Sequence, residues 1–268
     1  MYFSMEDMNY WYEIHGEGVP VVLLHGFTGS TLTWDKVVTA RPDGMQLITV
    51  DLPGHGWTKG TSRITMDSCI DDLHGLFQHL ELDTFFLVGY SMGGRAALSY
   101  TVKYPESVRG LILESASPGL KDTKARKNRE AGDEELAKLL EEEGIESFVD
   151  YWENIPLFAT QKELPDETQA AIRAERMSQS KKGLADSLRG MGTGSQPSNW
   201  EALKDVTVPV KLLAGELDEK FVAINQQMAE MLPYAELDIF PKCGHALHIE
   251  QPEHFQQALL EFAKLHIS

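Results

Sequence analysis

The sequence predicts a single α/β domain built on a mostly parallel, doubly wound sheet. Short apolar runs alternate with stretches of helical periodicity along the chain, and this alternation is typical of a parallel sheet covered by helices. The length of 268 residues suits one domain with an insertion. The content of 42% hydrophobic and 24% charged residues is that of an ordinary globular protein.

The first expected central strand covers residues 19–24, a continuous apolar run of the kind found in strands buried on both faces. Comparable runs predict further strands at residues 46–51, 85–89, 110–114, 210–215 and 235–240. Helical patterns separate most of these runs, notably at residues 66–80, 94–103 and 222–232. We therefore expect strands joined by helical crossovers, with no internal repeat.

The segment from about residue 117 to residue 205 departs from this rhythm. It contains helical patterns, such as residues 133–140, but no strand-like run. We interpret it as a helical cap inserted between two strands of a single domain that spans residues 1–268. The charges of residues 134–146 are expected to form a solvated helix face.

The net charge of −17 makes nucleic acid and anionic membrane surfaces poor partners, because both repel an acidic protein. Cys69 and Cys243 are the two cysteines of the chain, and their wide spacing favours neither a disulfide framework nor a zinc site. The sequence shows no signal peptide pattern and no apolar stretch of membrane-spanning length. We expect a cytoplasmic protein without metal or cofactor, and the oligomeric state stays open.

Residues 89–93 have the form Gly-x-Ser-x-Gly and lie between an expected strand and an expected helix. That context is the one in which this motif presents a nucleophile, here Ser91, on a tight turn. Glycines at both flanks avoid collisions of side chains within the turn. The start of the following helix favours negative charge that develops near the serine.

A serine nucleophile needs a base, and the base needs a carboxylate that orients it. Asp218 follows the strand at 210–215, and His245 follows the last expected strand, so the chain order is serine, aspartate, histidine. Glu216 competes with Asp218 for the role of the acid, and Asp218 is favoured. The other nearby histidines are expected to be structural or to face the substrate; they are His25, His55 and His248.

An oxyanion requires two backbone donors, one after the nucleophile and one from the loop that follows an early strand. The expected donors are the N–H groups of Met92 and Phe27. Gly26 would allow the second loop to turn its N–H toward the pocket. A glycine-rich turn without this role is the alternative.

With these motifs, the chain resembles the 2-succinyl-6-hydroxy-2,4-cyclohexadiene-1-carboxylate synthases of menaquinone biosynthesis, lyases of the α/β-hydrolase fold that eliminate pyruvate. The resemblance covers nearly the whole chain. Its most specific parts are residues 89–95, 114–120, 151–152 with 156–158, 187–194 and 215–221. The resemblance implies proton abstraction by the triad without an acyl-enzyme, although nucleophilic attack would need the same three residues.

The substrate of that family carries several carboxylates, for which arginine is a suitable partner. Arg95 lies one helical turn after Ser91 and can reach the same pocket. By resemblance, Arg95, Arg129 and Arg176 bind substrate carboxylates, and Tyr90 and Trp152 line the site. Arg126 competes with Arg129 for the first cap position, and a surface charge is the alternative for each arginine.

Two other functions stay open on the sequence. A carboxylesterase or carbon–carbon bond hydrolase would use Ser91 as a covalent nucleophile. A ligand-binding protein of the same fold would have lost its chemistry, which the presence of all three triad residues disfavours. Release of pyruvate from a small polycarboxylate substrate distinguishes the synthase from both.

Overall fold

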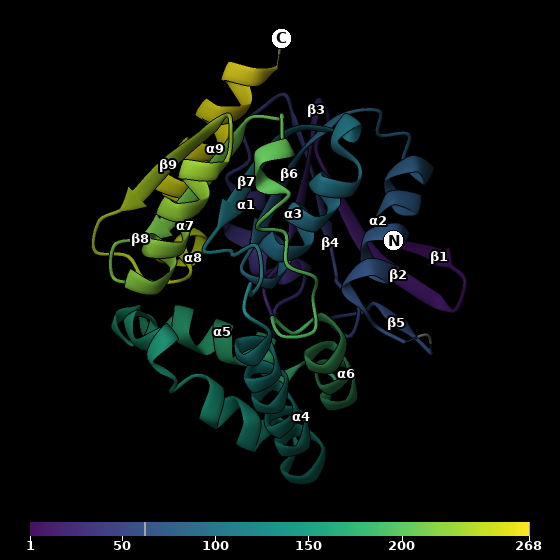
Figure 1. Cartoon of the computed structure of the whole chain (residues 1–268), viewed down its shortest axis with the longest axis vertical. Helices are drawn as coiled ribbons and strands as arrows, with labels where there is room; N and C mark the ends of the chain where they lie inside the picture. Colours follow the sequence, from purple (N-terminus) through teal and green to yellow (C-terminus); the bar gives the residue numbers. More distant parts are fainter. Residues whose placement is uncertain (62, 268) are drawn as a thin grey trace.

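The computed structural model describes residues 1–61 and 63–267, and nine strands within these residues form one sheet (Figure 1). The order across the sheet is β1-β2-β4-β3-β6-β7-β8-β9, and β5 pairs with β2. The strands are β1 (Tyr2–Met5), β2 (Met8–His15), β3 (Val19–Leu24), β4 (Met45–Val50), β5 (Lys59–Gly60), β6 (Phe85–Tyr90), β7 (Val108–Glu114), β8 (Val210–Gly215) and β9 (Ala235–Phe240).

The strands from β4 to β9 pair in parallel, which confirms the predicted mostly parallel sheet and all six predicted strands. The N-terminal strands β1, β2 and β5 pair antiparallel and were not predicted. In β2, buried residues Met8, Tyr10 and Tyr12 alternate with more exposed ones. A search for continuous apolar runs passes over such a strand, because only one of its faces is buried.

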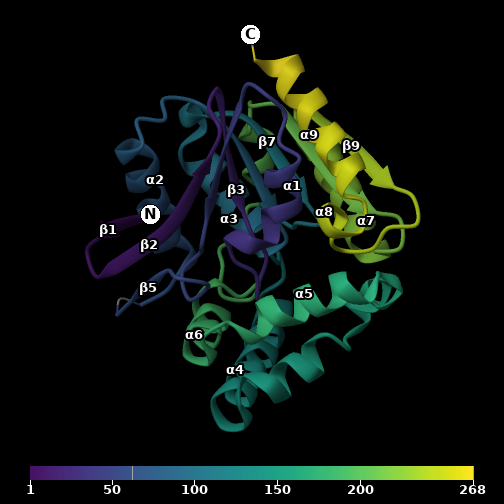
Figure 2. The same ribbon diagram turned by 180° about the vertical axis from the view of Figure 1, so that it is seen from behind.

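Helices cover both faces of the sheet. The helices α2, α3 and α7 lie on the face toward the viewer in Figure 1, and α1, α8 and α9 lie on the face seen in Figure 2. Their bounds are α1 (Asp35–Thr39), α2 (Met66–His79), α3 (Met92–Lys103), α7 (Glu219–Met231), α8 (Leu247–Glu250) and α9 (Pro252–His266). The predicted helices at 66–80, 94–103 and 222–232 are thus confirmed within a few residues at their ends.

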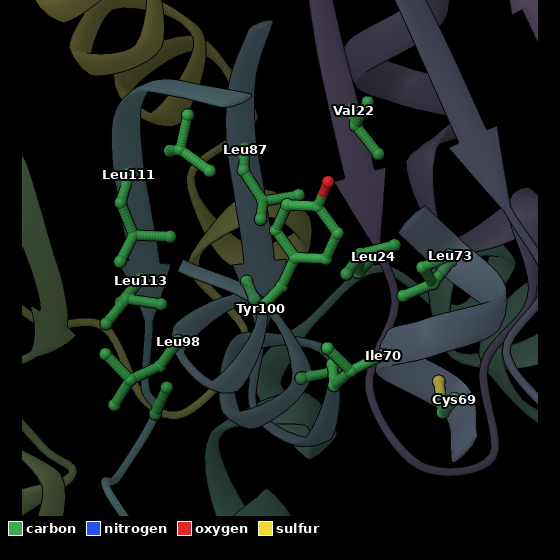
Figure 3. Packing of buried hydrophobic residues seen from close by; sticks show 14 of the residues in the cluster. Val22, Leu24, Cys69, Ile70, Leu73, Leu87, Leu98, Tyr100, Leu111 and Leu113 are labelled. Atoms are coloured by element: carbon green, nitrogen blue, oxygen red, sulfur yellow. The ribbon is translucent and has the colours of Figure 1, made fainter. Parts of the chain in front are cut away.

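Strand side chains divide between the two faces with the period of two that a pleated strand imposes. In β3, Val22 and Leu24 pack with α2 and α3, whereas Val21 and Leu23 pack with α9. Figure 3 shows the first of these layers, in which Leu87 of β6 and Tyr100 of α3 lie side by side. The sheet therefore has a core on each side, as the doubly wound prediction requires.

A group of helices between β7 and β8 lies beyond one end of the sheet (Figure 1). It consists of α4 (Thr123–Trp152), η3 (Pro156–Glu163), α5 (Asp166–Met177) and α6 (Lys181–Met191). We call this group the cap. It has its own apolar cluster, which includes Leu140, Phe148 and Leu184. The helix α4 is kinked at Gly144, where φ is 88°.

Among the described residues, no helix has both the length and the apolar character needed to cross a membrane.

Candidate active site

The turn between β6 and α3 holds Ser91 in a conformation that side chains rarely adopt, with φ of 51° and ψ of −106°. Two glycines make this turn possible. A Cβ atom on Gly89 would lie 2.4 Å from the carbonyl oxygen of Gly93, and one on Gly93 would lie 2.1 Å from that of Leu24. Such distances exclude a side chain at either glycine. The positive φ of Ser91 is itself strained, and the packing around the turn must hold it in place.

Three side chains from separate segments form a chain of hydrogen bonds. Ser91 Oγ lies 3.0 Å from His245 Nε2, and His245 Nδ1 lies 2.6 Å from Asp218 Oδ2. A carboxylate only accepts, so His245 carries its proton on Nδ1 and accepts from the serine hydroxyl at Nε2. The histidine is 1% exposed and the aspartate 8%. The arrangement can move a proton at Ser91 or at a molecule bound beside it.

The structure separates Asp218 from its competitor. Glu216 is exposed and accepts from the backbone N–H of Lys242 at 2.8 Å, whereas Asp218 begins α7 and faces His245. The geometry therefore favours Asp218 as the partner of His245.

The other three histidines of the sequence analysis have structural partners. His25 accepts from the backbone N–H of Leu52 at 2.9 Å, and burial lowers the pKa of His25 to about 4. His55 packs against His25, with ring centroids 5.1 Å apart. His248 donates from Nδ1 to the buried carboxylate of Glu114 at 2.8 Å.

The loop after β3 lies against the serine turn. A Cβ atom on Gly26 would come within 2.6 Å of the Tyr90 ring and 3.5 Å of Ser91 Cβ, so Gly26 permits this close approach. Phe27 follows directly and lines the same cavity as Ser91. Met92 is the first residue of α3, so its N–H points out of the helix end. Neither N–H group donates a hydrogen bond to another described residue, as the predicted oxyanion role would require.

A cavity of about 1020 Å³ lies between the carboxyl ends of the strands and the cap. This is where ligands bind in open α/β sheets. From the predicted site, Ser91, His245, Phe27 and Met92 line it together with Tyr90, Arg95, Arg129 and Trp152. The Trp152 ring contacts that of Phe27 edge to face, with centroids 5.4 Å apart. Within the described residues, no group of three metal-ligating side chains is found.

Two arginines bring positive charge to this cavity. Arg95 is 8% exposed and donates to the carbonyl of Met191 at 2.7 Å and to the side chain of Gln196. Burial and the nearby charge of Arg129 lower the pKa of Arg95 to about 10, so it remains charged at neutral pH. Arg129 donates from Nε to Asp133 at 2.8 Å. An anionic ligand would offset the cost of holding both charges there.

The other two arginines named in the sequence analysis, Arg126 and Arg176, do not line the large cavity. Arg126 donates to the backbone carbonyls of Gly194 and Gln196, at 3.2 and 3.1 Å. Arg176 is 6% exposed, lies over the ring of Phe158 and lines a second cavity of about 370 Å³ within the cap. Phe158 itself lines the large cavity. The structure thus brings Arg129 into the large cavity and places Arg176 behind a wall of it.

No role was assigned from the sequence to four side chains of the site, three beside His245 and one beside the arginines. The rings of Phe158 and Phe221 pack against His245, with centroids 6.1 and 4.7 Å from it. Glu250 accepts from the backbone N–H groups on both sides of His245, those of Gly244 at 2.7 Å and Ala246 at 3.3 Å. Asp133 lies beside the two arginines. Its spacing of four residues from Arg129 on a helix was the one signal of these contacts in the sequence.

Known proteins similar to this chain include synthases of one family. The profile described as the alpha/beta hydrolase fold matches residues 19–252. A protein of Bacillus subtilis strain 168, named as a candidate 2-succinyl-6-hydroxy-2,4-cyclohexadiene-1-carboxylate synthase, is 46% identical over 90% of this chain and 89% of its own. The 2-succinyl-6-hydroxy-2,4-cyclohexadiene-1-carboxylate synthase of Enterobacter sp. strain 638 is 31% identical, and the match covers 92% of each chain.

Solved structures agree with these relatives. The structure of MenH from S. aureus superposes with a TM-score of 0.93 at 37% identity, over 98% of this chain and 100% of that one. A thermophilic esterase from Thermogutta terrifontis, solved with malate bound, gives a TM-score of 0.84 at 29% identity, over 97% and 94% of the two chains.

Proposed function

This chain belongs to the α/β-hydrolase-fold family of 2-succinyl-6-hydroxy-2,4-cyclohexadiene-1-carboxylate synthases, and we propose that it catalyses the reaction for which that family is named. The substrate would be 2-succinyl-5-enolpyruvyl-6-hydroxy-3-cyclohexene-1-carboxylate, and the second product would be pyruvate. The observation that carries the proposal is the joint lining of one cavity by the Ser91–His245 pair and two arginines.

In the proposed mechanism, the Ser91–His245 pair takes a proton from the ring carbon that bears the succinyl group. Asp218 stabilises the charge that His245 gains. Negative charge develops on the succinyl carbonyl oxygen, where the N–H groups of Phe27 and Met92 would donate. The electron pair then forms the double bond between ring carbons 2 and 3, the double bond between carbons 3 and 4 moves to carbons 4 and 5, and the bond from carbon 5 to the enolpyruvyl oxygen breaks. The enolpyruvate that leaves takes up a proton to become pyruvate.

We also propose that the cap and the sheet supply different residues to the substrate site. The cap segment at about residues 117–205 supplies Arg129 and Trp152 to the cavity, while the sheet side supplies Arg95 and Tyr90. The arginines would bind carboxylates of the substrate, and the aromatic side chains would pack on its ring. Arg176 would act on the substrate from behind Phe158, over whose ring it lies, and through its charge near Tyr90. Cys69 and Cys243 are free and buried, which supports a reducing compartment such as the cytoplasm.

The experiment is a coupled assay in which lactate dehydrogenase and NADH report pyruvate released from the substrate. The wild-type protein is expected to release pyruvate, and Ser91→Ala is expected to reduce kcat by about a hundredfold or more, because a positioned acid–base group contributes about that much. Substrate incubated without enzyme gives the background. Absence of pyruvate release from folded wild-type protein would refute the proposal.

Esterase activity is the second candidate, and the superposition with the Thermogutta terrifontis esterase favours it. The same triad would then attack an ester through Ser91 Oγ. Hydrolysis of p-nitrophenyl acetate, measured beside the pyruvate assay, compares the two. Fast ester turnover together with no pyruvate would assign the protein to esterases.

A further inference from the structure

The buried acid Asp133 holds one arginine of the cavity from its inner side. Asp133 is 1% exposed, and its Oδ1 accepts from Arg129 Nε at 2.8 Å across one turn of α4. Burial raises the pKa of the Asp133 carboxyl, while the charges of Arg129 and Arg95 oppose that rise. The acid lies close enough to both arginines that line the cavity for their charges to interact with its own.

Few polar groups other than Arg129 stabilise the Asp133 carboxylate: the charge of Arg95 and the backbone N–H of Gly194. Asp133 Oδ2 is buried and has no hydrogen-bond partner among the described residues. The bond to Arg129 is the one side-chain hydrogen bond that Asp133 makes within residues 1–61 and 63–267. Burying a carboxylate is costly, and these contacts offset only part of that cost, because the pKa of Asp133 remains raised. Contribution to stability is therefore a poor explanation for an acid at this position.

The hydrogen bond from Arg129 Nε to Asp133 determines which edge of the Arg129 guanidinium remains for a ligand. An arginine has five N–H donors in a rigid plane, and Nε occupies one edge of that plane. With Nε held by Asp133, the Nη1 and Nη2 groups at the end of the plane remain. Neither group makes a hydrogen bond to a described residue, and the side chain of Arg129 is 41% exposed. This is the edge that binds a carboxylate with two parallel bonds.

Arg95 is held by different means. Its Nη1 donates to Met191 and Gln196, and no carboxylate of the described residues lies within ion-pair distance of it. One arginine of the cavity is therefore positioned by neutral acceptors and the other by Asp133. Without Asp133, the long and half-exposed side chain of Arg129 would sample several rotamers, and a ligand would have to order it.

We propose that Asp133 is a positioning residue for substrate specificity: it orients Arg129 so that the guanidinium meets a carboxylate of a polycarboxylate substrate end-on. The inference rests on the proposed function, because it assigns the carboxylate that Arg129 receives to the substrate of that reaction. Asp133 also lines the cavity, but it is only 1% exposed, so it would act through Arg129 rather than by its own contact with the substrate. Its negative charge opposes anion binding, so its benefit lies in geometry alone.

Orientation of Arg129 by Asp133 favours substrate binding, whereas the negative charge of Asp133 opposes it. The test uses two variants that separate these effects. Asp133→Ala removes both the acceptor and the charge, and KM for pyruvate release is expected to rise about tenfold, with kcat within about threefold of wild type. Asp133→Asn keeps an acceptor for Nε and removes only the charge, so KM is expected at or below the wild-type value. If Asp133 acted by charge alone, both variants would lower KM, which would overturn the proposal.

A double-mutant cycle with Arg129→Ala separates positioning from a general structural role. If Asp133 acts through Arg129, Asp133→Ala changes KM no further in the Arg129→Ala background. Additive effects, or an equal loss of kcat in both Asp133 variants, would contradict the proposal. Asp186→Ala is the matched control, since Asp186 accepts from Lys182 across one turn of α6 outside the cavity. Its KM should equal that of wild type.

Failure of the proposed reaction is recognised separately. If the wild-type protein releases no pyruvate, the same variants are compared by calorimetric titration with succinate, the dicarboxylate fragment of the proposed substrate. Weaker binding by Asp133→Ala than by Asp133→Asn then supports the positioning role, and equal binding overturns it.

Discussion

The serine turn requires glycine at single positions, because any larger side chain there would clash with the backbone. Gly93 lies so close to the end of β3 that a Cβ atom would overlap the carbonyl oxygens of Leu24 and His25, at 2.1 and 2.5 Å. Backbone atoms cannot move aside cheaply. We expect Gly93→Ala to destabilise the protein by about 3 kcal/mol, as overpacking does, and to lower pyruvate release through displacement of Ser91. Urea unfolding measures the first effect.

The matched substitution is Gly132→Ala in α4. There a Cβ atom would meet no heavy atom of the described residues within 4 Å, and alanine favours a helix over glycine by about 0.5–1 kcal/mol. Gly132→Ala is therefore expected to raise the free energy of unfolding slightly. Equal effects of the two substitutions would show that close contact at Gly93 is not the cause.

The segment that carries His245 and the cap meet at one carboxylate, that of Glu250. Glu250, at the end of α8, accepts from the N–H groups that flank His245 and also from Thr160 Oγ1 of η3, at 3.1 Å. Thr160 also packs against Gly244, where a Cβ atom would lie 2.1 Å from Thr160 Oγ1. The position of the base is thus coupled to the docking of the cap.

Replacing that carboxylate should disturb catalysis more than binding. Glu250→Gln loses one of two accepting oxygens, so the loop around His245 shifts, and kcat is expected to fall about tenfold or more with a smaller change in KM. Glu253→Gln, an exposed position in the first turn of α9, should leave both constants unchanged. Steady-state kinetics of pyruvate release decides, and an unaltered kcat in Glu250→Gln would rule out the coupling.

The net charge of −17 belongs to the molecule as a whole. Charges of one sign repel each other across a compact structure, and salt screens this repulsion. We expect the melting temperature at neutral pH to rise when sodium chloride increases from about 0.05 to about 0.5 M, concentrations that shorten the screening length roughly threefold. Differential scanning calorimetry measures the shift.

The control uses the same salt series near the isoelectric point of about 4.9. There the net charge is small, so the rise should largely disappear. A melting temperature that falls with salt at neutral pH would mean that specific ion pairs, such as those of Arg189 with Glu134 and Glu141, outweigh the overall repulsion.

Local patterns in the sequence were sufficient for the doubly wound fold and for the three residues that form the Ser91 hydrogen-bond chain. Each central strand is a continuous apolar run because helices bury both of its faces. Ser91 and Asp218 follow such strands, and His245 follows the partly exposed edge strand β9. The carboxyl ends of these parallel strands meet at one edge of the sheet. The proximity of these residues therefore follows from chain order and strand direction.

The tertiary structure alone decided which cap residues face the cavity. The cap helices carry Arg126, Arg129 and Arg176. The direction in which each side chain points depends on its position along the helix, and the packing of the cap decides which helix face meets the sheet. Thr160 and Glu250 are 90 residues apart, and no local pattern relates them. Short-range periodicity determines the strands and the turns of this protein, whereas contacts between distant segments determine how its cavity is lined.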